Sequence, residues 1–241
     1  MSKLLGNTSV GSRPKALLVL EDGSVFEGFS CAAEGEVFGE VCFNTSLEGY
    51  LEIISDPSYA GQIITMTYPQ IGNYGVNLDD LQADSLALRG LVVHEMCFTP
   101  SNWRSTQSLP EYLKGQNVVA IGGSDTRALT SHLRDKGAQR GVISTVDLDP
   151  ASLLAKVRES ESIVGVNLAK TVSRNAAQGF DELPASHSFA VAGPAEERYN
   201  VVAYDCGVKK SILQGLVRVG CKLTVVPWDT PAEEVLAMNP D

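Results

Sequence analysis

The amino-acid sequence predicts an α/β protein with two domains, and three observations carry this prediction. Short apolar runs rich in β-branched residues alternate with amphipathic helical patterns over residues 15–169. A stretch without a sustained apolar period follows at 170–199, as expected of a linker. A strand, helix, strand, helix pattern then fills 200–241, which is typical of the start of a doubly wound parallel sheet. Residues 1–14 have no periodic pattern and are expected to form a disordered arm.

The first domain opens with a predicted β-hairpin. The runs "ALLVL" and "SVFEGF" flank the segment "EDG", in which Gly23 supplies the positive φ that tight turns need. Four further apolar runs rich in β-branched residues are expected to be strands. They lie at 62–68, 90–95, 117–121 and 141–145.

Three helices are expected between and after these strands, each with a recognisable start. Ser108 is followed three residues later by Glu111, which is the spacing of a capping box. Ser124 or Asp125 can cap the second helix, and Asp149 can cap the third. The predicted helices span 108–115, 124–137 and 149–160.

The second domain is expected to begin after a linker that holds one short strand, "SFAVA", at 188–192. Thr230, Pro231 and Glu233 have the spacing of a capping box with proline at the first helical position. A parallel sheet needs helices on both faces, and two strands with two helices do not supply them, so this domain is expected to be incomplete. Its predicted elements are a strand at 201–204, a helix at 208–220, a strand at 222–227 and a helix at 230–238.

Composition narrows the possible partners. The formal net charge of −10 disfavours nonspecific binding to nucleic acid or an anionic membrane, which both need a basic surface. No apolar run reaches the ~18 residues of a spanning helix. The five cysteines are odd in number and lack a CxxC pair, which argues against a disulfide framework and a metal site. We therefore expect a cytoplasmic protein. Its cysteines are Cys31, Cys42, Cys97, Cys206 and Cys221.

Cys206 is the first candidate for catalysis, because it follows an apolar strand and precedes an amphipathic helix. A thiolate there would lie at the carboxyl edge of a sheet, where α/β proteins bind ligands. The alternative is that Cys206 is a small packing residue, since free cysteines are usually buried. His132 is expected to be a partly exposed structural histidine, and no role is assigned to His94 or His187.

Two segments are unusually rich in turn residues, "FNTSLEGYLEIISDPSYAGQ" and "TYPQIGNYGVN". In the first, Pro57 presets φ and the Asp56 carboxylate can accept a hydrogen bond from a following backbone N–H. In the second, Gly72 and Gly75 can adopt positive φ. From the residues alone, both segments are interpreted as structural loops.

Four segments together resemble the small subunit of carbamoyl-phosphate synthetase: "ALLVLEDG", "FNTSLEGYLEIISDPSYAGQIITMTYPQIGNYGVN", "DTRALTSHLRDKGAQ" and "VVAYDCGVKKSILQGLVRVGCKLTVVP". The resemblance implies an N-terminal swivelling β/β/α domain. It also implies that 200–241 is the opening βαβα unit of a doubly wound, flavodoxin-like class I glutamine amidotransferase domain. In that family the nucleophilic cysteine and its His and Glu partners lie beyond the position of Asp241, so no catalytic residue is expected in this chain, which should be inactive alone.

The resemblance further implies a function for the whole protein. Such a subunit hydrolyses glutamine through a cysteinyl thioester and passes ammonia to a large subunit. That partner uses ATP and Mg to make carbamoyl phosphate from bicarbonate, for arginine and pyrimidine synthesis, and this chain would need no cofactor of its own. Ser58 of the Asp-Pro-Ser-Tyr motif would contact glutamine. Cys206 stands where the family often has phenylalanine, which implies a structural residue.

Two other functions stay open at this point. The chain as given would be a non-catalytic docking module for the large subunit if its role were only to hold that partner. A cysteine hydrolase that uses Cys206 would require the replacement of Cys206 by serine to abolish an activity of this chain alone.

Overall fold

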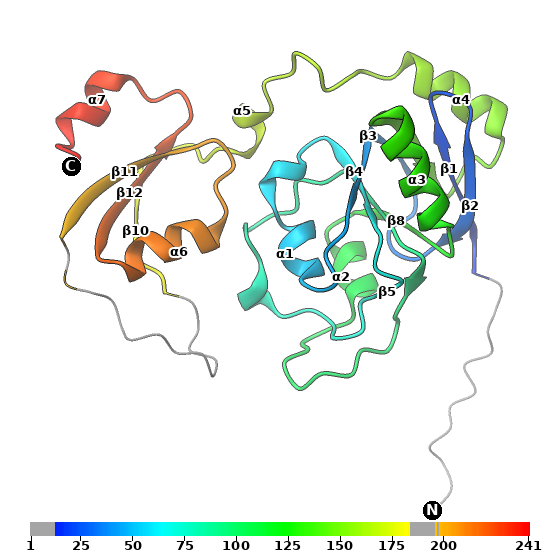
Figure 1. Cartoon of the computed structure of the whole chain (residues 1–241), viewed down its shortest axis with the longest axis horizontal. Coiled ribbons are helices and arrows are strands. Elements are labelled where there is room, and N and C mark those ends of the chain that lie inside the picture. Colours follow the sequence, from blue (N-terminus) through cyan, green and yellow to red (C-terminus); the bar gives the residue numbers. More distant parts are fainter. Residues whose placement is uncertain (1–12, 184–195, 197) are drawn as a thin grey trace, which may run out of the picture.

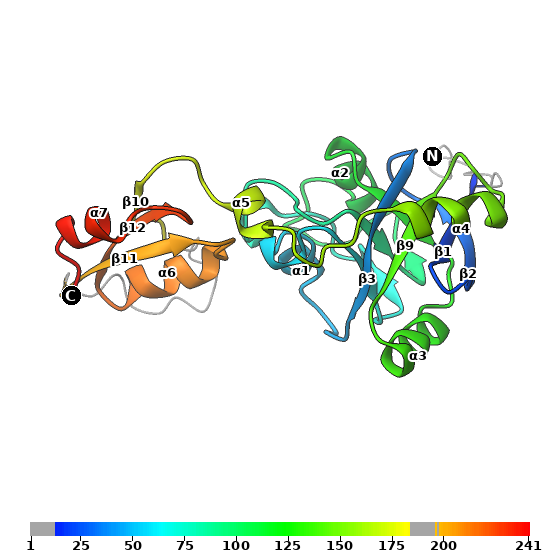
Figure 2. The ribbon, with the colours of Figure 1, turned by 90° about the horizontal axis from the view of Figure 1, so that it is seen from above.

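A seven-stranded closed barrel and a separate three-stranded sheet form the two parts of the chain (Figure 1). The computed structural model describes residues 13–183, 196 and 198–241. The predicted strand at 188–192, His187 and most of the predicted N-terminal arm lie outside these residues. Helix α5 (Leu168–Val172) lies on the path between the barrel and the smaller sheet in both ribbon views (Figures 1 and 2).

The barrel strands run in the order β1-β2-β8-β6-β4-β3-β9, which closes through antiparallel pairing of β1 with β9. The predicted hairpin is confirmed as β1 and β2, with Gly23 at φ 93° in the turn. Three of the four other predicted strands, at 62–68, 117–121 and 141–145, hold within a few residues. Barrel strands span Lys15–Leu20 (β1), Val25–Ser30 (β2), Glu36–Asn44 (β3), Gln62–Met66 (β4), Gly90–Val92 (β6), Val119–Gly122 (β8) and Gln139–Ser144 (β9).

Strand β3 is the longest of the barrel strands, and it was not predicted from the sequence. Its sequence EVFGEVCFN has a glycine in the middle, and eight of its nine residues are only partly buried, which weakens the apolar signal. The run at 90–95 was predicted as one strand, but it forms two. A break at Val93 and His94 separates β6 from β7 (Glu95–Met96), which pairs with β5 (Gln70–Ile71) outside the barrel.

Helices cover both the ends and the wall of the barrel. In β1, Leu18 points into a cluster with the α3 side chains, whereas Leu17 and Val19 pack against α4, so the strand is buried on both faces. The predicted capping box at Ser108 and Glu111 is confirmed. Asp125 and Asp149 are the N-caps predicted for the next two helices. These helices are α2 (Leu109–Gly115), α3 (Thr126–Lys136) and α4 (Pro150–Glu159).

A short helix that the sequence did not predict, α1 (Tyr50–Ile54), is capped by a distant tyrosine. The Tyr74 hydroxyl accepts hydrogen bonds from the backbone N–H groups of Gly49 at 3.1 Å and Tyr50 at 2.9 Å. The two tyrosine rings stack with centroids 4.0 Å apart, and the Tyr50 hydroxyl donates to the carbonyl of Gly75 at 2.6 Å. The glycine-rich segment "IGNYGVN" therefore has the structural role that its residues indicated.

The smaller sheet has the strand order β10-β12-β11, with β11 and β12 parallel and β10 antiparallel at one edge. Helix α6 connects the parallel pair, and its Leu213 and Val217 pack on Leu223 and Val225 of β12. The predicted strand, helix, strand unit is thus confirmed. Its elements are β10 (Gln178–Phe180), β11 (Tyr199–Asp205), α6 (Lys210–Arg218), β12 (Cys221–Pro227) and α7 (Ala232–Ala237).

Two expectations for this region are wrong. The expected linker at 170–199 contains β10, which pairs with β12 and makes β12 the central strand of the sheet. Thr230 does not form a capping box, because Pro231 is the N-cap and the Thr230 hydroxyl donates to the carbonyl of Pro227 at 2.9 Å. That hydrogen bond closes the turn after β12 and leaves the start of α7 without a side-chain cap.

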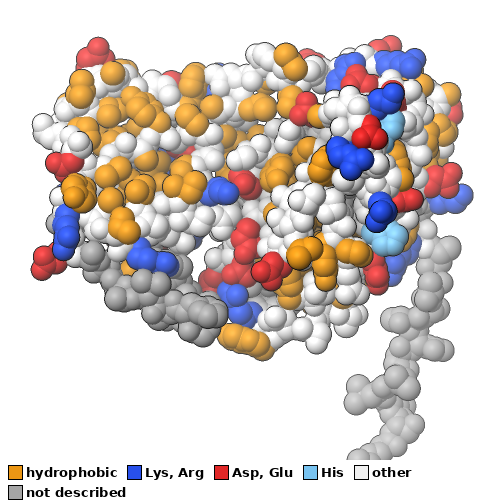
Figure 3. All heavy atoms as spheres, viewed as in Figure 1, with side chains coloured by type: hydrophobic (Ala, Val, Ile, Leu, Met, Phe, Trp, Pro, Cys, Tyr) orange, Lys and Arg blue, Asp and Glu red, His pale blue; other side chains and the backbone are white. Residues whose placement is uncertain are grey.

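Amide hydrogen exchange should be faster in the smaller sheet than in the barrel. Every barrel strand has a neighbour on each side, whereas β11 pairs only with β12 among the described residues. Figure 3 shows many apolar side chains at the surface of this part, and Ile212 and Val219 are 51% and 62% exposed. The exchange rates of both parts, measured at two protein concentrations, test this expected difference. Equal protection in both parts at both concentrations would contradict it.

Candidate functional site

The Asp-Pro-Ser-Tyr segment forms a single 3-10 turn, Pro57–Tyr59, directly after α1. The Asp56 carboxylate accepts a hydrogen bond from the backbone N–H of Ser58 at 2.9 Å, as the sequence predicted. Pro57 is buried, while Ser58 is exposed. Because Asp56 satisfies the backbone, the Ser58 hydroxyl is not needed to cap the turn, and it makes no hydrogen bond within the described part of the chain.

A second turn joins β11 to α6 and is organised by the carboxylate of Asp205. The whole residue is only 5% exposed. It accepts hydrogen bonds from the backbone N–H and the Nε of Arg174, both at 3.0 Å, and from the N–H groups of Gly207 at 3.1 Å and Val208 at 3.2 Å. Burial by itself would raise the pKa of Asp205, but these hydrogen bonds outweigh it and lower the pKa. Asp205 is therefore held as a carboxylate.

The two turns lie against each other, which brings the barrel into contact with the carboxyl end of β11. Gly207 has φ 93°, and a Cβ atom there would stand 3.1 Å from Pro57 Cβ and 2.8 Å from Val172 Cγ2. The Lys209 ammonium lies 3.4 Å from the carboxylate of Asp56. We call the region made of residues 56–59, 172–174 and 205–209 the junction.

A cavity of about 380 Å³ opens beside the junction. Its lining includes Pro57 and Gln82 from the barrel domain and Arg174, Asp205 and Lys210 from the other side. Ser58 does not line it, although its neighbour Pro57 does. Ligands bind preferentially at domain boundaries and at the carboxyl ends of parallel strands, and this cavity meets both conditions.

Cys206 lies in the junction, but it is exposed, so it is not the buried packing residue that is typical of free cysteines. Its thiol takes part in no hydrogen bond with the described residues. Burial raises the pKa of the Cys31 and Cys42 thiols to about 12, which keeps both protonated.

His132 has the structural role that the sequence predicted. Its Nε2 lies 2.7 Å from the carboxylate of Asp22, and its side chain is 24% exposed. Burial opposes ionisation of Asp22, but hydrogen bonds from Ser24, His132 and Gln139 lower its pKa to about 2. The Nδ1 atom of His94 lies 3.0 Å from the Ser124 carbonyl, which is the one hydrogen bond of this side chain with the described residues. Neither histidine lies at the junction.

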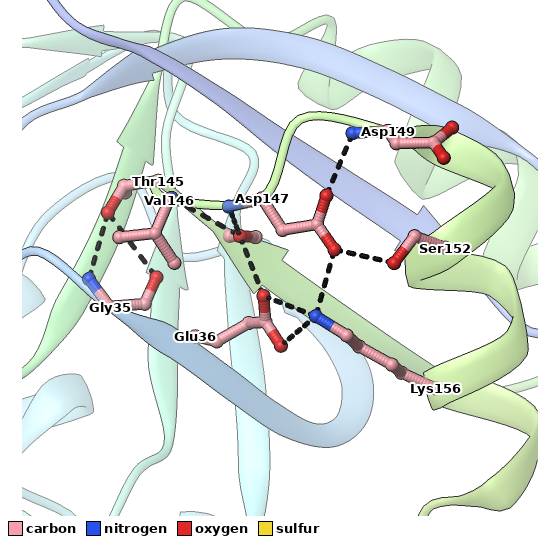
Figure 4. Close-up of polar contacts among 9 residues, drawn as sticks. Gly35, Glu36, Thr145, Val146, Asp147, Asp149, Ser152 and Lys156 are labelled. Atoms are coloured by element: carbon pink, nitrogen blue, oxygen red, sulfur yellow. Dashed lines mark hydrogen bonds and ion pairs between the residues drawn. The ribbon is translucent and has the colours of Figure 1, made fainter.

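A cluster of charged side chains lies away from the junction, around Lys156 of α4 (Figure 4). Lys156 Nζ donates to both carboxylate oxygens of Glu36, at 2.8 and 3.0 Å, and to Asp147 at 2.8 Å. Ser144 and Ser152 donate to these two carboxylates at 3.1 and 2.7 Å. The hydrogen bond from Lys156 lowers the pKa of Asp147 and raises the pKa of Lys156 itself. Since each charge has a partner, the cluster ties α4 to β3 and the end of β9.

The described residues contain neither a cluster of metal-ligating side chains nor a membrane-spanning helix. No group of three His, Cys, Asp or Glu side chains in 13–183 and 198–241 could hold a metal ion. No helix of the same ranges is long and apolar enough to cross a bilayer.

Two residues of the site were not found from the sequence. Arg174 was placed in a linker, yet it binds Asp205 from 31 positions away. Gln82 contacts Ser211 from 129 positions away. No local pattern marks either residue, because each hydrogen bond joins segments that meet only in the folded chain.

The fold and the junction define a class: a two-domain α/β protein in which a β-barrel packs against the carboxyl end of a parallel strand pair, with a ligand-sized cavity at the boundary. Residues 18–143, just over half of the chain, match the family model described as carbamoyl-phosphate synthase small chain, CPSase domain. The chain therefore belongs to the carbamoyl-phosphate synthase small chain family.

Close relatives agree with this assignment. A carbamoyl phosphate synthase small chain from Syntrophotalea carbinolica is 54% identical over 228 residues, which cover 94% of this chain and 61% of that protein. One from Thermotoga maritima is 52% identical over 227 residues, which cover 94% of this chain and 55% of that protein. The chain thus spans only somewhat more than half the length of these relatives.

Proposed function

We propose that this chain is part of the small, glutamine-hydrolysing subunit of a cytoplasmic carbamoyl-phosphate synthetase. The observation that carries the proposal is the junction, where the Ser58 turn of the barrel domain lies at the carboxyl end of β11 beside a cavity. The barrel would be the swivelling β/β/α domain of the family, and the smaller sheet would open its class I glutamine amidotransferase domain. The similarity to relatives called small chain supports the same proposal.

The proposed reaction is hydrolysis of the glutamine side-chain amide to glutamate and ammonia. It needs a thiolate nucleophile, a general base and donors for the tetrahedral oxyanion. We assign none of these to the described residues; in the proposal they come from a further segment of the subunit. A large subunit would be the partner and would use ATP and Mg to join the ammonia to bicarbonate, for arginine and pyrimidine synthesis.

Replacement of Ser58 by alanine should raise the KM for glutamine by roughly 3-fold to 100-fold, measured on the chain completed after Asp241 with the corresponding segment of the Syntrophotalea carbinolica relative. The exposed hydroxyl is available to the ligand, and the loss of one hydrogen bond costs about 0.5–1.5 kcal/mol, or ~3 if the partner is the glutamine carboxylate. Ser101, which is also exposed, is the control position. Ser101→Ala should leave the KM as it was.

A structural role for Ser58 gives a different result. The melting temperature of Ser58→Ala would then fall while the KM for glutamine stayed constant, and that pair of results would end the binding assignment. Ammonia-dependent synthesis by the large subunit should change little in this variant, since that route does not use glutamine.

The test of the function itself is glutamine-dependent carbamoyl phosphate formation by the completed chain together with its large subunit. Failure to form carbamoyl phosphate from glutamine, while ammonia supports the reaction, would overturn the proposal. The alternative is that the 241-residue chain serves only to dock the large subunit. Ammonia release from glutamine by that chain alone would contradict the docking-only role.

A further inference from the structure

Helix α6 begins at the junction without a cap from its own segment. Lys209 is the N-cap residue and its side chain makes no capping hydrogen bond. The first N–H groups of a helix have no partner within the helix and need acceptors from elsewhere. Here Gln82, from the barrel domain, supplies two of them. Its backbone carbonyl accepts from Lys210 N at 2.9 Å, and its side-chain Oε1 accepts from Ser211 N at 3.2 Å.

Gln82 is itself fixed to the segment that leads into the Ser58 turn. Its backbone N–H donates to the hydroxyl of Ser55 at 2.9 Å. Ser55 is fully buried and donates to the carbonyl of Leu51 in α1 at 2.6 Å. A chain of hydrogen bonds therefore runs from α1 through Ser55 and Gln82 to the first turn of α6.

The orientation of the Gln82 amide is also set by its surroundings. Its Nε2 lies 3.4 Å from the carbonyl of Asp80, so the nitrogen faces the barrel domain and the oxygen faces α6. Only the oxygen can accept a hydrogen bond from a helix N–H. The ion pair of Asp56 with Lys209, at 3.4 Å, is a second connection between the barrel domain and the start of α6.

We infer that Gln82 is a positioning residue: by capping α6 from the barrel domain, it fixes the β11–α6 turn relative to the Ser58 turn. This inference rests on the proposed function, in which the two turns face one glutamine molecule. A cap within a single domain would stabilise α6 alone. A cap that comes from the other domain sets the distance between the two sides of the junction as well.

The capping hydrogen bonds are tested by amide exchange, followed by NMR at Lys210 and Ser211 in the 241-residue chain. Gln82→Ala removes the side-chain acceptor and keeps the backbone carbonyl. The exchange rate of the Ser211 N–H should therefore increase about 2-fold to 10-fold relative to the exchange rate of the Lys210 N–H. Gln82→Glu retains an acceptor at a helix N-terminus, where a negative charge is favourable, and should keep Ser211 protected. Unchanged exchange at Ser211 in Gln82→Ala would overturn the cap.

Gln116 gives a matched control, because it is an exposed glutamine at the end of α2 whose side chain makes no hydrogen bond with the described residues. Gln116→Ala should leave exchange at Ser211 as in the unaltered chain. A similar rise in both alanine variants would mean that the effect is not specific to the junction, and would contradict the inference.

The positioning role is tested by kinetics on the completed chain with its large subunit. Gln82→Ala should raise the KM for glutamine about 3-fold or more with kcat within twofold, and Gln82→Glu should restore the KM. A normal KM in Gln82→Ala, together with lost protection of Ser211, would overturn positioning and leave only a cap. If the unaltered enzyme uses ammonia but not glutamine, the proposed function fails and the positioning role fails with it. The exchange data then still decide whether the cap exists.

Discussion

Replacing Asp205 with alanine is expected to lower the free energy of unfolding by about 3 kcal/mol, the lower end of the range for breaking a buried ion pair. The lower end of the range applies because the Arg174 side chain is 24% exposed, whereas the Asp205 side chain is 8% exposed. Four hydrogen bonds to one carboxylate are lost, and the guanidinium of Arg174 is left without its partner. Denaturant unfolding at pH 7 measures the change.

The effect of Asp205 should depend on pH in a defined direction. Its pKa is lower in the folded chain than the ~3.9 of an unfolded aspartate, so its stabilisation is complete above that value. As the pH falls below ~4 towards the folded pKa, the carboxylate is protonated. The difference in unfolding free energy between the unaltered chain and Asp205→Ala should then shrink.

Asp229 is an exposed aspartate of the same domain and serves as the control. Asp229→Ala should change stability by no more than about 0.5 kcal/mol. A difference between Asp205→Ala and the unaltered chain that stays constant from pH 7 to below pH ~4 would contradict the role of the ionised carboxylate.

Replacing Gly28 with alanine is expected to cost about 3 kcal/mol or more, because it overpacks the contact between the neighbouring barrel strands β2 and β8. A Cβ atom at this position would overlap the carbonyl oxygen of Gly122 and would stand 2.7 Å from Ile121 Cγ1. The first contact is with backbone, so a change of side-chain rotamer cannot relieve it. The melting temperature and the denaturant midpoint report the loss.

Gly115 provides the matched control for this change. It lies in α2, and a Cβ atom there would meet nothing within 4 Å. Gly115→Ala should leave stability unchanged or raise it by about 0.5–1 kcal/mol, since alanine favours helix. If Gly28→Ala were as stable as the unaltered chain, β2 and β8 could not approach each other as closely as described.

Local signals in the sequence were sufficient for the elements that carry their own start or turn. Ser108 and Glu111 form a capping box within four residues, and Asp56 caps the turn that contains Ser58. Gly23 has the positive φ expected in the turn between β1 and β2. In each case the atoms that make the contact are only a few positions apart, so the residue pattern contains the whole interaction. The resemblance that picked out Ser58 likewise rests on a contiguous motif, and its contact with glutamine stays a prediction.

The tertiary structure alone decided which of these elements meet. Strand β3 has a weak apolar signal and is held by pairing with β4 and β9, and α1 depends on Tyr74, 24 positions after Tyr50. Arg174 reaches Asp205 across 31 positions at the junction, and Gln82 reaches Ser211 across 129 positions beside it. A hydrogen bond between distant segments exists only after the core has brought them together, and glutamine or arginine in a loop is compatible with many partners. The sequence by itself therefore determined the family and most of the elements, whereas packing decided how the barrel and the smaller sheet meet at the junction.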